Sequence, residues 1–330
     1  MSKQSITLHA FREEVPGRRW QALYEATWPA YRSWYLREGA AARPSVAEAE
    51  DALHRYMPEL VPTWRRLASL TGEEPISSAM LSHWRMPAFA PACSQAVVSS
   101  GVRALIRNYD YHPDLFERVV MSTRLRRRDV LGTSDCLWGL LDGMNADGLA
   151  VSLAFGGARG SGRGFGIPLV VRYLLEIADT VATAMSELRT IPVSMSYNLT
   201  MTDRFGAAST AYVAPGRQPE VRSCAVATNH RFDHPDCPGD AARLRSVERR
   251  SHLQRLLTRE PHPDRLAEAF LRAPLRNTDF RGGFGTLYTA DYRPDVGQLH
   301  YRWPGTAWTR TFDSTDAELR IDVPTRYVQR

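Results

Sequence analysis

The pattern of apolar and polar positions changes near residue 93. Before it, apolar residues recur mainly at helical spacing and strand signals are few, so residues 1–92 are predicted to be mostly helical. Ser45 is the clearest predicted helix start, with Glu48 three residues later to complete a capping box. After residue 93, short runs rich in β-branched residues and bounded by glycine predict strands over 95–100, 102–109 and 149–155. Residue 93 is therefore a predicted boundary.

The second half of the chain alternates between the two patterns. A long amphipathic helix is predicted to open at Pro168, because apolar residues follow at helical spacing: Val170, Leu174, Ile177, Val181, Met185 and Leu188. Strands are predicted over 193–201, 208–214 and 223–229, a charged helix over 246–257, and a β-rich stretch over 285–312. The helices and strands do not alternate as regularly as in a doubly wound parallel sheet, so we expect an α+β layered fold.

Composition narrows the class of protein. The chain of 330 residues is 43% hydrophobic and 24% charged, with a mean hydropathy of -0.36, which is typical of a globular protein. No apolar run approaches the ~18 residues that span a bilayer, so no membrane association is expected. The first twenty residues contain charges and no continuous apolar core, so we expect no secretory signal and a cytoplasmic location.

The net charge of +6 and the pI near 9.3 raise the question of nucleic-acid binding. The only dense basic run is Arg124 with residues 126–128, and the other arginines are interleaved with acids. No nucleic-acid recognition motif accompanies this charge, so no nucleic-acid partner is expected.

Neither a metal nor a cofactor is predicted. The four cysteines form no CxxC pair, and the nine histidines form no HExxH motif. The glycine-rich segment 156–166 lies between a predicted strand and a predicted helix, as a dinucleotide-binding loop would. However, the third glycine of that motif is replaced by Phe165 or Ile167, depending on the starting glycine, so we expect only a flexible loop beside a pocket.

The segment around Cys93 contains the most informative pattern. Two predicted strands flank Ser100 and Gly101, which predicts a hairpin. A two-residue turn at 100–101 would pair Cys93 with Asn108, and a turn at 101–102 would pair it with Asp110. Either register places the thiol near the sequence RNYD at 107–110, where an arginine and an aspartate can ionise and orient it.

Two points remain open for this cysteine. Composition alone favours a buried structural cysteine, because free cysteines are commonly buried. In addition, Arg107 and Asp110 are three residues apart and would face opposite sides of a regular strand, so serving one site would require the strand to bend or end near Tyr109.

Eight sequence motifs together resemble a known family. In order they are ACS (92–94), RNYDY (107–111), DGMNADGLAVS (142–152), SYNLTMTDRFG (196–206), AVATNH (225–230), SVERRSHLQRLL (246–257), GTLYTADY (285–292) and LHYRWPGTAW (299–308). This series resembles the acyl-coenzyme A:isopenicillin N acyltransferases and, more distantly, choloylglycine hydrolases and acid ceramidase, all N-terminal nucleophile (Ntn) hydrolases. The resemblance runs from about residue 28 to 312.

The resemblance implies a four-layer αββα sandwich made as a precursor that cuts itself before the nucleophile. Residues 1–92 would then be a helical pro-segment, and residues 93–330 the catalytic region, with the two pieces staying associated. The implied site residues are Cys93 as nucleophile, Arg107 and Asp110 of the RNxD motif, Asn145 and Asn229 as oxyanion donors, and Arg249 as the late arginine. Arg250 is the alternative to Arg249, and Asn198 the less favoured rival of Asn229.

Two departures from the family pattern affect what can be carried over. Ala146 and Asp147 stand where the bile-salt enzymes have glutamate and lysine, which argues against bile-salt specificity. Ala92 precedes the nucleophile where the acyltransferases usually have glycine, which leaves the efficiency of self-cleavage open.

The implied chemistry is attack of the Cys93 thiolate on a linear amide, with the new α-amino group as base. Hydrolysis of the resulting acyl-thioester is the expected main outcome, and the substrate is a small N-acyl amide or an acyl-coenzyme A. Acyl transfer to an amine is the first alternative. A Cys–His hydrolase without self-cleavage is the second, because the histidine partner of such a pair can be distant in sequence. A homo-oligomer is compatible with the sequence.

Overall fold

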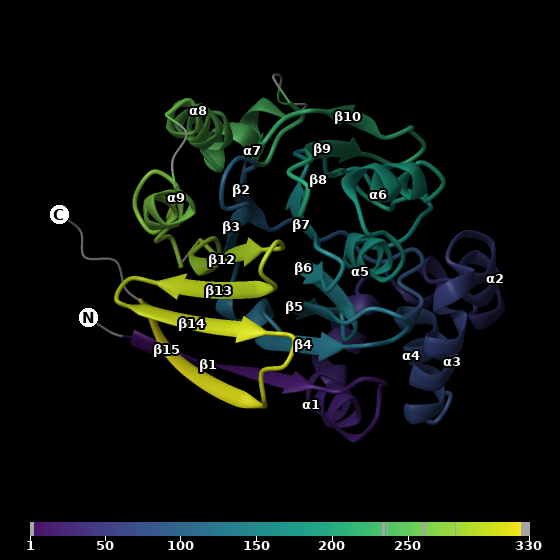
Figure 1. Ribbon diagram of the computed structural model, residues 1–330. Coiled ribbons are helices and arrows are strands. Elements are labelled where there is room, and N and C mark those ends of the chain that lie inside the picture. The colour runs from purple at the N-terminus through teal and green to yellow at the C-terminus, as the bar shows by residue number, and fades with distance from the viewer. Residues whose placement is uncertain (1–2, 233–234, 236, 260–261, 281, 325–330) are drawn as a thin grey trace.

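The computed structural model describes residues 3–232, 235, 237–259, 262–280 and 282–324 (Figure 1). The strands are β1 (Lys3–Arg12), β2 (Ala92–Val98), β3 (Ala104–Asp110), β4 (Val119–Thr123), β5 (Val130–Asp135), β6 (Gly139–Asn145), β7 (Leu149–Phe155), β8 (Tyr197–Asp203), β9 (Ala208–Val213), β10 (Glu220–Arg222), β11 (Val226–Ala227), β12 (Thr286–Arg293), β13 (Gln298–Trp303), β14 (Thr306–Thr311) and β15 (Ala317–Pro324). The helices are α1 (Arg18–Tyr35), α2 (Val46–Tyr56), α3 (Val61–Leu70), α4 (Pro75–Leu81), α5 (Ile167–Ile177), α6 (Val181–Leu188), α7 (Pro238–Arg243), α8 (Ser246–Leu257) and α9 (Pro263–Phe270). Short 3-10 helices span Ala40–Ala42, Pro58–Leu60 and Pro113–Leu115.

Two sheets form the centre of the molecule. Within the described residues, the larger sheet has nine strands in the order β10-β9-β8-β7-β6-β5-β4-β1-β15, and the smaller has six in the order β11-β2-β3-β12-β13-β14. All the pairs are antiparallel except β1 with β4. Strands β2 and β3 of the smaller sheet contact β7 and β8 of the larger one, so the two sheets face each other there.

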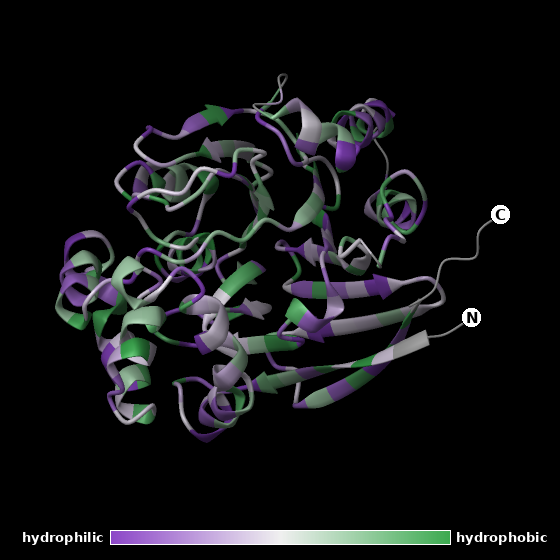
Figure 2. Cartoon of the chain, turned by 180° about the vertical axis from the view of Figure 1, so that it is seen from behind, coloured by the Kyte–Doolittle hydropathy of each residue, from purple (hydrophilic) through white to green (hydrophobic). Residues whose placement is uncertain are grey.

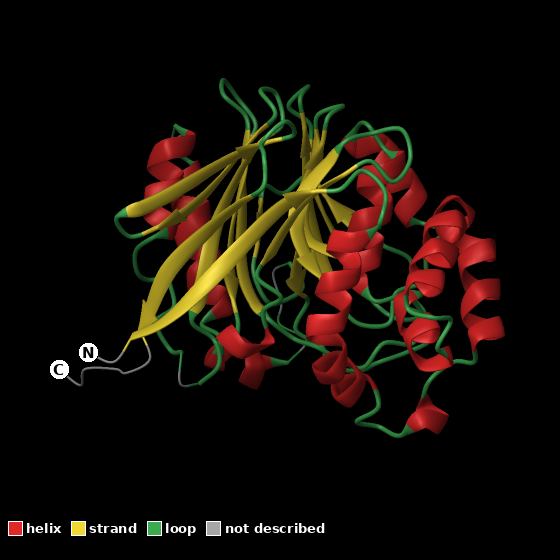
Figure 3. Cartoon of the chain, turned by 90° about the horizontal axis from the view of Figure 1, so that it is seen from below, coloured by secondary structure: helices red, strands yellow, loops and turns green. Residues whose placement is uncertain are grey.

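Helices cover the outer faces of both sheets (Figure 3). Helices α5 and α6 pack against the larger sheet, while α8 and α9 pack against the smaller one. Nearly every side chain of α5 is buried, whereas α8 buries only a few of its residues and shows hydrophilic positions along its length at the top right of Figure 2. The predicted α+β class is therefore confirmed, with two sheets.

The described part of residues 1–92 contains four α-helices, in line with the helical prediction, but it also contains strand β1, which this prediction missed. Strand β1 lies between β4 and β15 in the larger sheet. Its side chains alternate strictly, with Ile6, Leu8 and Ala10 buried in the core and His9 exposed. This period of two is the usual signature of a half-buried strand, so the sequence did carry evidence for it.

The single helix predicted from Pro168 to Leu188 is two helices. Helix α5 ends at Ile177, and Ala178 adopts extended backbone angles. Helix α6 starts afresh at Val181, where the Thr180 side chain accepts a hydrogen bond from the Thr183 N–H and so caps it. The helical spacing of apolar residues continues through both helices, so it did not reveal the break between them. The Thr180 cap sets where α6 begins.

The other predicted elements are largely confirmed. Ser45 caps α2 by accepting a hydrogen bond from the Glu48 N–H at 3.1 Å. The Glu48 carboxylate does not return to Ser45 but accepts from Trp84 Nε1, so only half of the predicted capping box forms.

None of the described helices is both long and apolar enough to cross a membrane.

The glycine-rich segment between β7 and α5 owes its glycines to close packing. A Cβ at Gly164 would meet the backbone of Val193 at 2.4 Å, and one at Gly162 would meet Pro215 at 2.5 Å. The segment does line a cavity, of about 400 Å³, through Gly162 and Arg163. Gly164 therefore lets the loop approach the chain that leads into β8, and Gly162 lets it approach the chain that follows β9.

Candidate active site

The β2–β3 hairpin pairs Cys93 with Tyr109, Ala92 with Asp110 and Ser94 with Asn108. Both predicted registers were wrong by one residue, because the connection is a five-residue loop over 99–103 and not a two-residue turn. Cys93 is still close to the RNYD sequence. It shares a face of the sheet with Arg107, since residues two apart on a strand point the same way.

The Cys93 thiol lies on the face of the smaller sheet that points toward the larger sheet, and there it meets Arg107. Arg107 Nη2 donates to Cys93 Sγ at 2.9 Å, and Nη1 forms a fully buried ion pair with Asp142 Oδ2 at 2.5 Å. Asp142, on β6 of the opposite sheet, also accepts hydrogen bonds from the hydroxyls of Tyr288 and Thr133, each at 2.6 Å, and from that of Tyr292. The guanidinium is thus held against the sulfur by a carboxylate whose own position is fixed by three hydroxyls.

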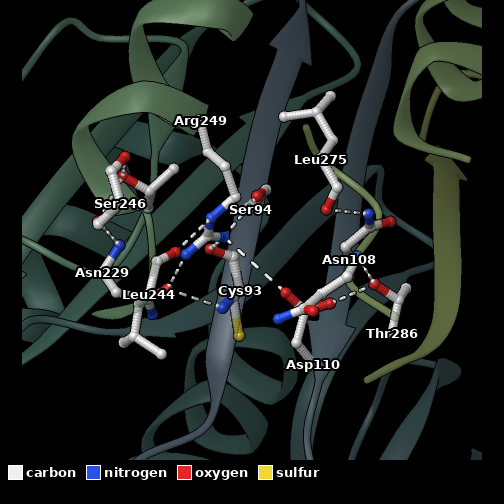
Figure 4. Close-up of polar contacts among 12 residues, drawn as sticks. Cys93, Ser94, Asn108, Asp110, Asn229, Leu244, Ser246, Arg249, Leu275 and Thr286 are labelled. Carbon is white, nitrogen blue, oxygen red and sulfur yellow. Dashed lines mark hydrogen bonds and ion pairs between the residues drawn. The ribbon is translucent and has the colours of Figure 1, made fainter. Parts of the chain in front are cut away.

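The main chain of Cys93 is held from the other face by Arg249 of α8 (Figure 4). Arg249 Nη1 donates to the Cys93 carbonyl at 2.6 Å and to Ser94 Oγ at 2.7 Å, and its nearest carboxylate is Asp110 at 3.9 Å. Asp110 in turn accepts a hydrogen bond from Thr286 at 2.6 Å. Arg107 and Asp110 therefore face opposite sides of β3, as their spacing requires, and they flank the same cysteine at the point where β3 ends at Asp110.

Asn229 provides the third contact with Cys93. Its Oδ1 accepts from the Cys93 N–H at 3.0 Å and from Arg249 Nη2 at 2.6 Å. Its Nδ2 donates to the carbonyls of Pro91 and Phe155, at 3.3 and 3.2 Å. The side-chain amide therefore touches the chain on both sides of the Ala92–Cys93 peptide bond.

Asn198 supports the loop that carries Asn229. Its Nδ2 donates to the carbonyls of Thr228 and His230, the two neighbours of Asn229, at 2.8 and 2.9 Å. The Asn229 N–H donates to Ser246 Oγ at the start of α8. Asn198 therefore contacts the backbone on both sides of Asn229.

Burial controls the ionisation of the site. Cys93 is fully buried, and this burial raises the pKa of its thiol to about 11, although the nearby Arg107 opposes the shift. Burial also raises the pKa of Asp110 to about 6, against the opposing effect of Arg249. In the intact chain the thiol is therefore protonated at neutral pH.

Asn145 lies apart from this cluster. Its Nδ2 donates to the carbonyls of Leu175 and Ala178 at the end of α5, and its Oδ1 accepts from the Leu149 N–H. It is three residues from Asp142 on β6 and so faces the helices, while Asp142 faces the other sheet. The oxyanion role expected of Asn145 is not supported by this position, where it braces the β6–β7 turn.

Of the two candidate late arginines, Arg249 is the one that reaches Cys93. Arg249 is buried with 3% exposure, whereas Arg250 is only partly buried. Residues one apart on a helix point about 100° away from each other, so only one of the two can face β2.

Sequence reasoning missed the residues that hold the site residues in place. Asp142 is the first residue of the DGMN motif, and as a buried acid it is a natural partner for the buried Arg107. Ser246, which fixes the Asn229 backbone, and Thr286, which fixes Asp110, carried no signal beyond their places in the late motifs.

No metal-binding group of histidine, cysteine or acidic residues occurs among the residues that the structure describes. Within that part of the chain, the Cys93 sulfur accepts a hydrogen bond from Arg107 and not from a histidine. His83 bonds the Cys136 carbonyl, and His230 bonds Ser246 and Thr228; His234 lies outside the described residues.

Several solved structures resemble this chain remotely. They include a mutant of conjugated bile acid hydrolase from Clostridium perfringens (11% identity, TM-score 0.42, covering 72% of this chain and 99% of that one) and penicillin V acylase from Agrobacterium tumefaciens (15%, 0.45, 66% and 84%). A Caenorhabditis elegans orthologue of N-acylethanolamine-hydrolyzing acid amidase is similar at 17% identity and a TM-score of 0.44, over 62% of this chain and 93% of that one. These similarities are too weak to indicate a shared activity. No curated protein matches the sequence.

A family model matches the sequence directly. The model described as acyl-coenzyme A:6-aminopenicillanic acid acyl-transferase matches residues 98–308, nearly two thirds of the chain. The matched region contains Arg107, Asp110, Asn229 and Arg249, and it begins five residues after Cys93. The resemblance inferred from the motifs is thereby confirmed, and the chain belongs to the acyl-coenzyme A:6-aminopenicillanic acid acyl-transferase family.

Proposed function

We propose that this protein is a cysteine Ntn enzyme that hydrolyses linear amide bonds through an acyl-thioester on Cys93. One observation carries the proposal. The sulfur, the amide nitrogen and the carbonyl oxygen of Cys93 are contacted by Arg107, Asn229 and Arg249, respectively. A structural cysteine would not require three separate polar side chains, two of them buried arginines, to contact its own atoms.

The first reaction at this site is cleavage of the chain between Ala92 and Cys93. The sulfur attacks the Ala92 carbonyl carbon, the thiol proton passes to the Cys93 nitrogen as the C–N bond breaks, and a thioester links Ala92 to the sulfur. Water then hydrolyses the thioester to leave a carboxylate on Ala92 and a free thiol with a free α-amino group on Cys93. The contact of Asn229 Nδ2 with Pro91 O, beside the bond to be cut, supports this step.

The mature enzyme uses the same residues on its substrate. The α-amino group of Cys93, with an ordinary pKa of ~7.7–8.0, takes the thiol proton. Asn229 Nδ2 loses its Pro91 partner when the cut end at Ala92 moves out of the site, so it becomes available to donate to the oxyanion. Arg107 favours the thiolate, and Asp110 balances the charge of the α-amino group and of Arg249.

The pro-segment in this proposal is residues 1–92, and the catalytic region is residues 93–330. Strand β1 of the pro-segment pairs with β15 over Lys3–Ala10 and with β4 over His9–Arg12, which supports two pieces that remain associated after cleavage. In this assignment, the two facing sheets with helices on their outer faces form the four-layer αββα sandwich of Ntn hydrolases.

Acyl transfer is the alternative outcome at the same thioester. Any nucleophile that reaches an acyl-enzyme can accept the acyl group, and the family description names a transferase. Water is abundant, so transfer to an amine requires a site that binds the amine and excludes water. The Cys–His alternative has less support, because the thiol contacts Arg107 and none of the described histidines.

The test supplies a linear N-acyl amide and an acyl-coenzyme A to the purified protein, each with and without an amine acceptor. Acid, amine and new amide products are followed by chromatography, and the acyl-enzyme is sought by mass spectrometry after acid quenching. We expect an acyl adduct on the peptide that contains Cys93 and release of the free acid. Transfer from acyl-coenzyme A that exceeds hydrolysis would replace the hydrolase with a transferase, and absence of any adduct on Cys93 would refute the proposal.

A further inference from the structure

A large cavity is lined by β12, β13 and β14 of the smaller sheet, by β1 and β15 of the larger sheet, and by the segment that follows α9. It has a volume of about 630 Å³, within the range of small-molecule sites. Cys93 is not among its lining residues. We call it the inter-sheet cavity; its walls include three arginines, Arg276, Arg302 and Arg320.

The charge of these arginines is only partly balanced. Arg276 is half-buried and makes no ion pair with any acid in the described part of the chain, so burial lowers its pKa without compensation. Arg302 pairs with Asp291 and Asp264, but its Nε is buried without a hydrogen-bond partner. Arg320 donates to Ser5 Oγ, which itself donates to Asp322, the single acid of the lining.

The remaining walls are suited to an apolar group. The rings of Phe280 and Trp303 line the cavity. Because Trp303 Nε1 already donates to the Leu287 carbonyl, Trp303 is left to contact a ligand through its ring. Aromatic rings next to guanidinium groups favour ligands that combine an anionic group with an apolar or planar part.

The cavity also borders the candidate active site. Thr286 and Tyr288 line it, and the same two side chains donate hydrogen bonds to Asp110 and Asp142. A ligand bound there would therefore contact the residues that hold the two acids of the site in place.

We propose that the inter-sheet cavity binds an organic anion, whose phosphate or carboxylate contacts Arg276 and whose apolar part packs on Phe280 and Trp303. A half-buried guanidinium without an acidic partner gains a charge-assisted hydrogen bond when an anion enters. The proposal goes beyond the reaction at Cys93, and binding requires neither self-cleavage nor turnover.

Isothermal titration calorimetry at low salt tests it on the full chain, both as wild type and as Cys93→Ala. The probes are coenzyme A for phosphate esters, hexanoate for carboxylates, and inorganic phosphate for the bare anion. The test variant is Arg276→Gln, with Arg276→Lys to keep the charge. Arg272→Gln is the matched control, because Arg272 lies nearby in sequence, is 75% exposed, pairs with Glu268 and does not line the cavity.

We expect coenzyme A or hexanoate to bind more tightly than inorganic phosphate, and the organic probe that binds identifies the source of the anion. Arg276→Gln should weaken this binding about tenfold or more, Arg276→Lys less, and Arg272→Gln less than twofold. Equal affinity of wild type and Arg276→Gln, binding of inorganic phosphate alone, or no binding of any probe would overturn the proposal. Since Cys93→Ala should bind as wild type does, failure of the proposed reaction leaves this result unaffected.

Discussion

The two faces of the β2–β3 hairpin carry two arginines with different surroundings. On the face toward the larger sheet, Arg107 contacts the Cys93 sulfur and is paired with the buried Asp142 at 2.5 Å. On the face under α8, Arg249 contacts the Cys93 carbonyl and Asn229, and its nearest carboxylate, Asp110, is 3.9 Å away. One cation therefore serves the side chain of the nucleophile, and the other serves its main chain.

The pKa shifts of the two arginines follow this difference. Burial by itself would lower the pKa of Arg107, but Cys93, Tyr288 and Asp142 raise it above its ordinary value. Burial lowers the pKa of Arg249, and Asp110 only partly opposes the change. Close pairing thus secures the charge beside the thiol. The charge of Arg249, beside the main chain, has no carboxylate as close as Asp142 is to Arg107. Its guanidinium is held mostly by neutral oxygens.

Replacing the residue on which both arginines converge should have the largest effect. Cys93→Ala removes the sulfur that attacks Ala92, so we expect an uncut chain of 330 residues, whereas wild type gives pieces 1–92 and 93–330. Intact-mass spectrometry under denaturing conditions distinguishes the two. Cys224→Ala is the matched control, since it removes a partly buried free thiol outside the site and should leave cleavage unchanged. Cleavage of Cys93→Ala, or an uncut and fully active wild type, would contradict the assignment.

Asn229 links the main-chain face to the scissile bond, and its loss should have the next largest effect. Removing an oxyanion donor typically lowers kcat by about 10²–10³, and we expect this for Asn229→Ala measured on the cleaved enzyme. Asn198→Ala is the comparison, because Asn198 holds the Thr228 and His230 carbonyls and acts only through the backbone. Its effect on kcat should be smaller. The reverse ranking would move the oxyanion site to β8.

The two arginines themselves should separate in their effects on the thiol. Loss of a cation in contact with a thiolate raises the thiol pKa by about one unit or more, so Arg107→Gln should shift the pH midpoint of Cys93 alkylation upward and slow turnover about 10-fold at pH 7. Arg249→Gln should move that midpoint less, because its guanidinium contacts the carbonyl and not the sulfur.

Iodoacetamide labelling of the cleaved enzyme, followed peptide by peptide, measures these midpoints. Arg107→Lys is the control that keeps the charge and should stay closer to wild type than Arg107→Gln does. Equal shifts for Arg107→Gln and Arg249→Gln would mean that the two faces do not act separately on Cys93.

The sequence predicted the strands that carry the site better than the contacts between them. The β-branched runs located β2, β3 and β7, because buried strands are rich in such residues, and the ordered motifs identified the family. The hairpin register was missed because it depends on a loop length that glycine positions alone do not define. The period of two in β1 was readable but overlooked.

Which side chains meet across the two sheets could not be predicted from strand patterns. Arg107 and Asp142 are on strands of different sheets, and their pairing depends on how those sheets face each other. Asn145 shows that a motif can also suggest too much. Its motif suggested a catalytic role, but it lies on the face of β6 opposite to that of Asp142, where it contacts the end of α5. A motif identifies a segment, and the face of the strand decides what each residue in it can touch.

Asp110 allows the smallest and most specific test, because it is the acid that balances the less compensated arginine. Burial raises its pKa to about 6, so its carboxylate becomes protonated as the pH falls through about 6. If the anion supports the reaction, turnover should fall about tenfold between pH 7 and pH 5, since only about a tenth of the group is ionised one unit below its pKa.

Stability should change in the opposite direction: an acid whose pKa is raised on folding destabilises the native state as the pH rises from about 4 through 6. Asp110→Asn can still accept the Thr286 hydrogen bond, and it should remove both the acid limb of the rate profile and this part of the pH dependence of unfolding by urea. An acid limb that persists unchanged in Asp110→Asn would assign it to another group and leave Arg249 held by neutral oxygens alone.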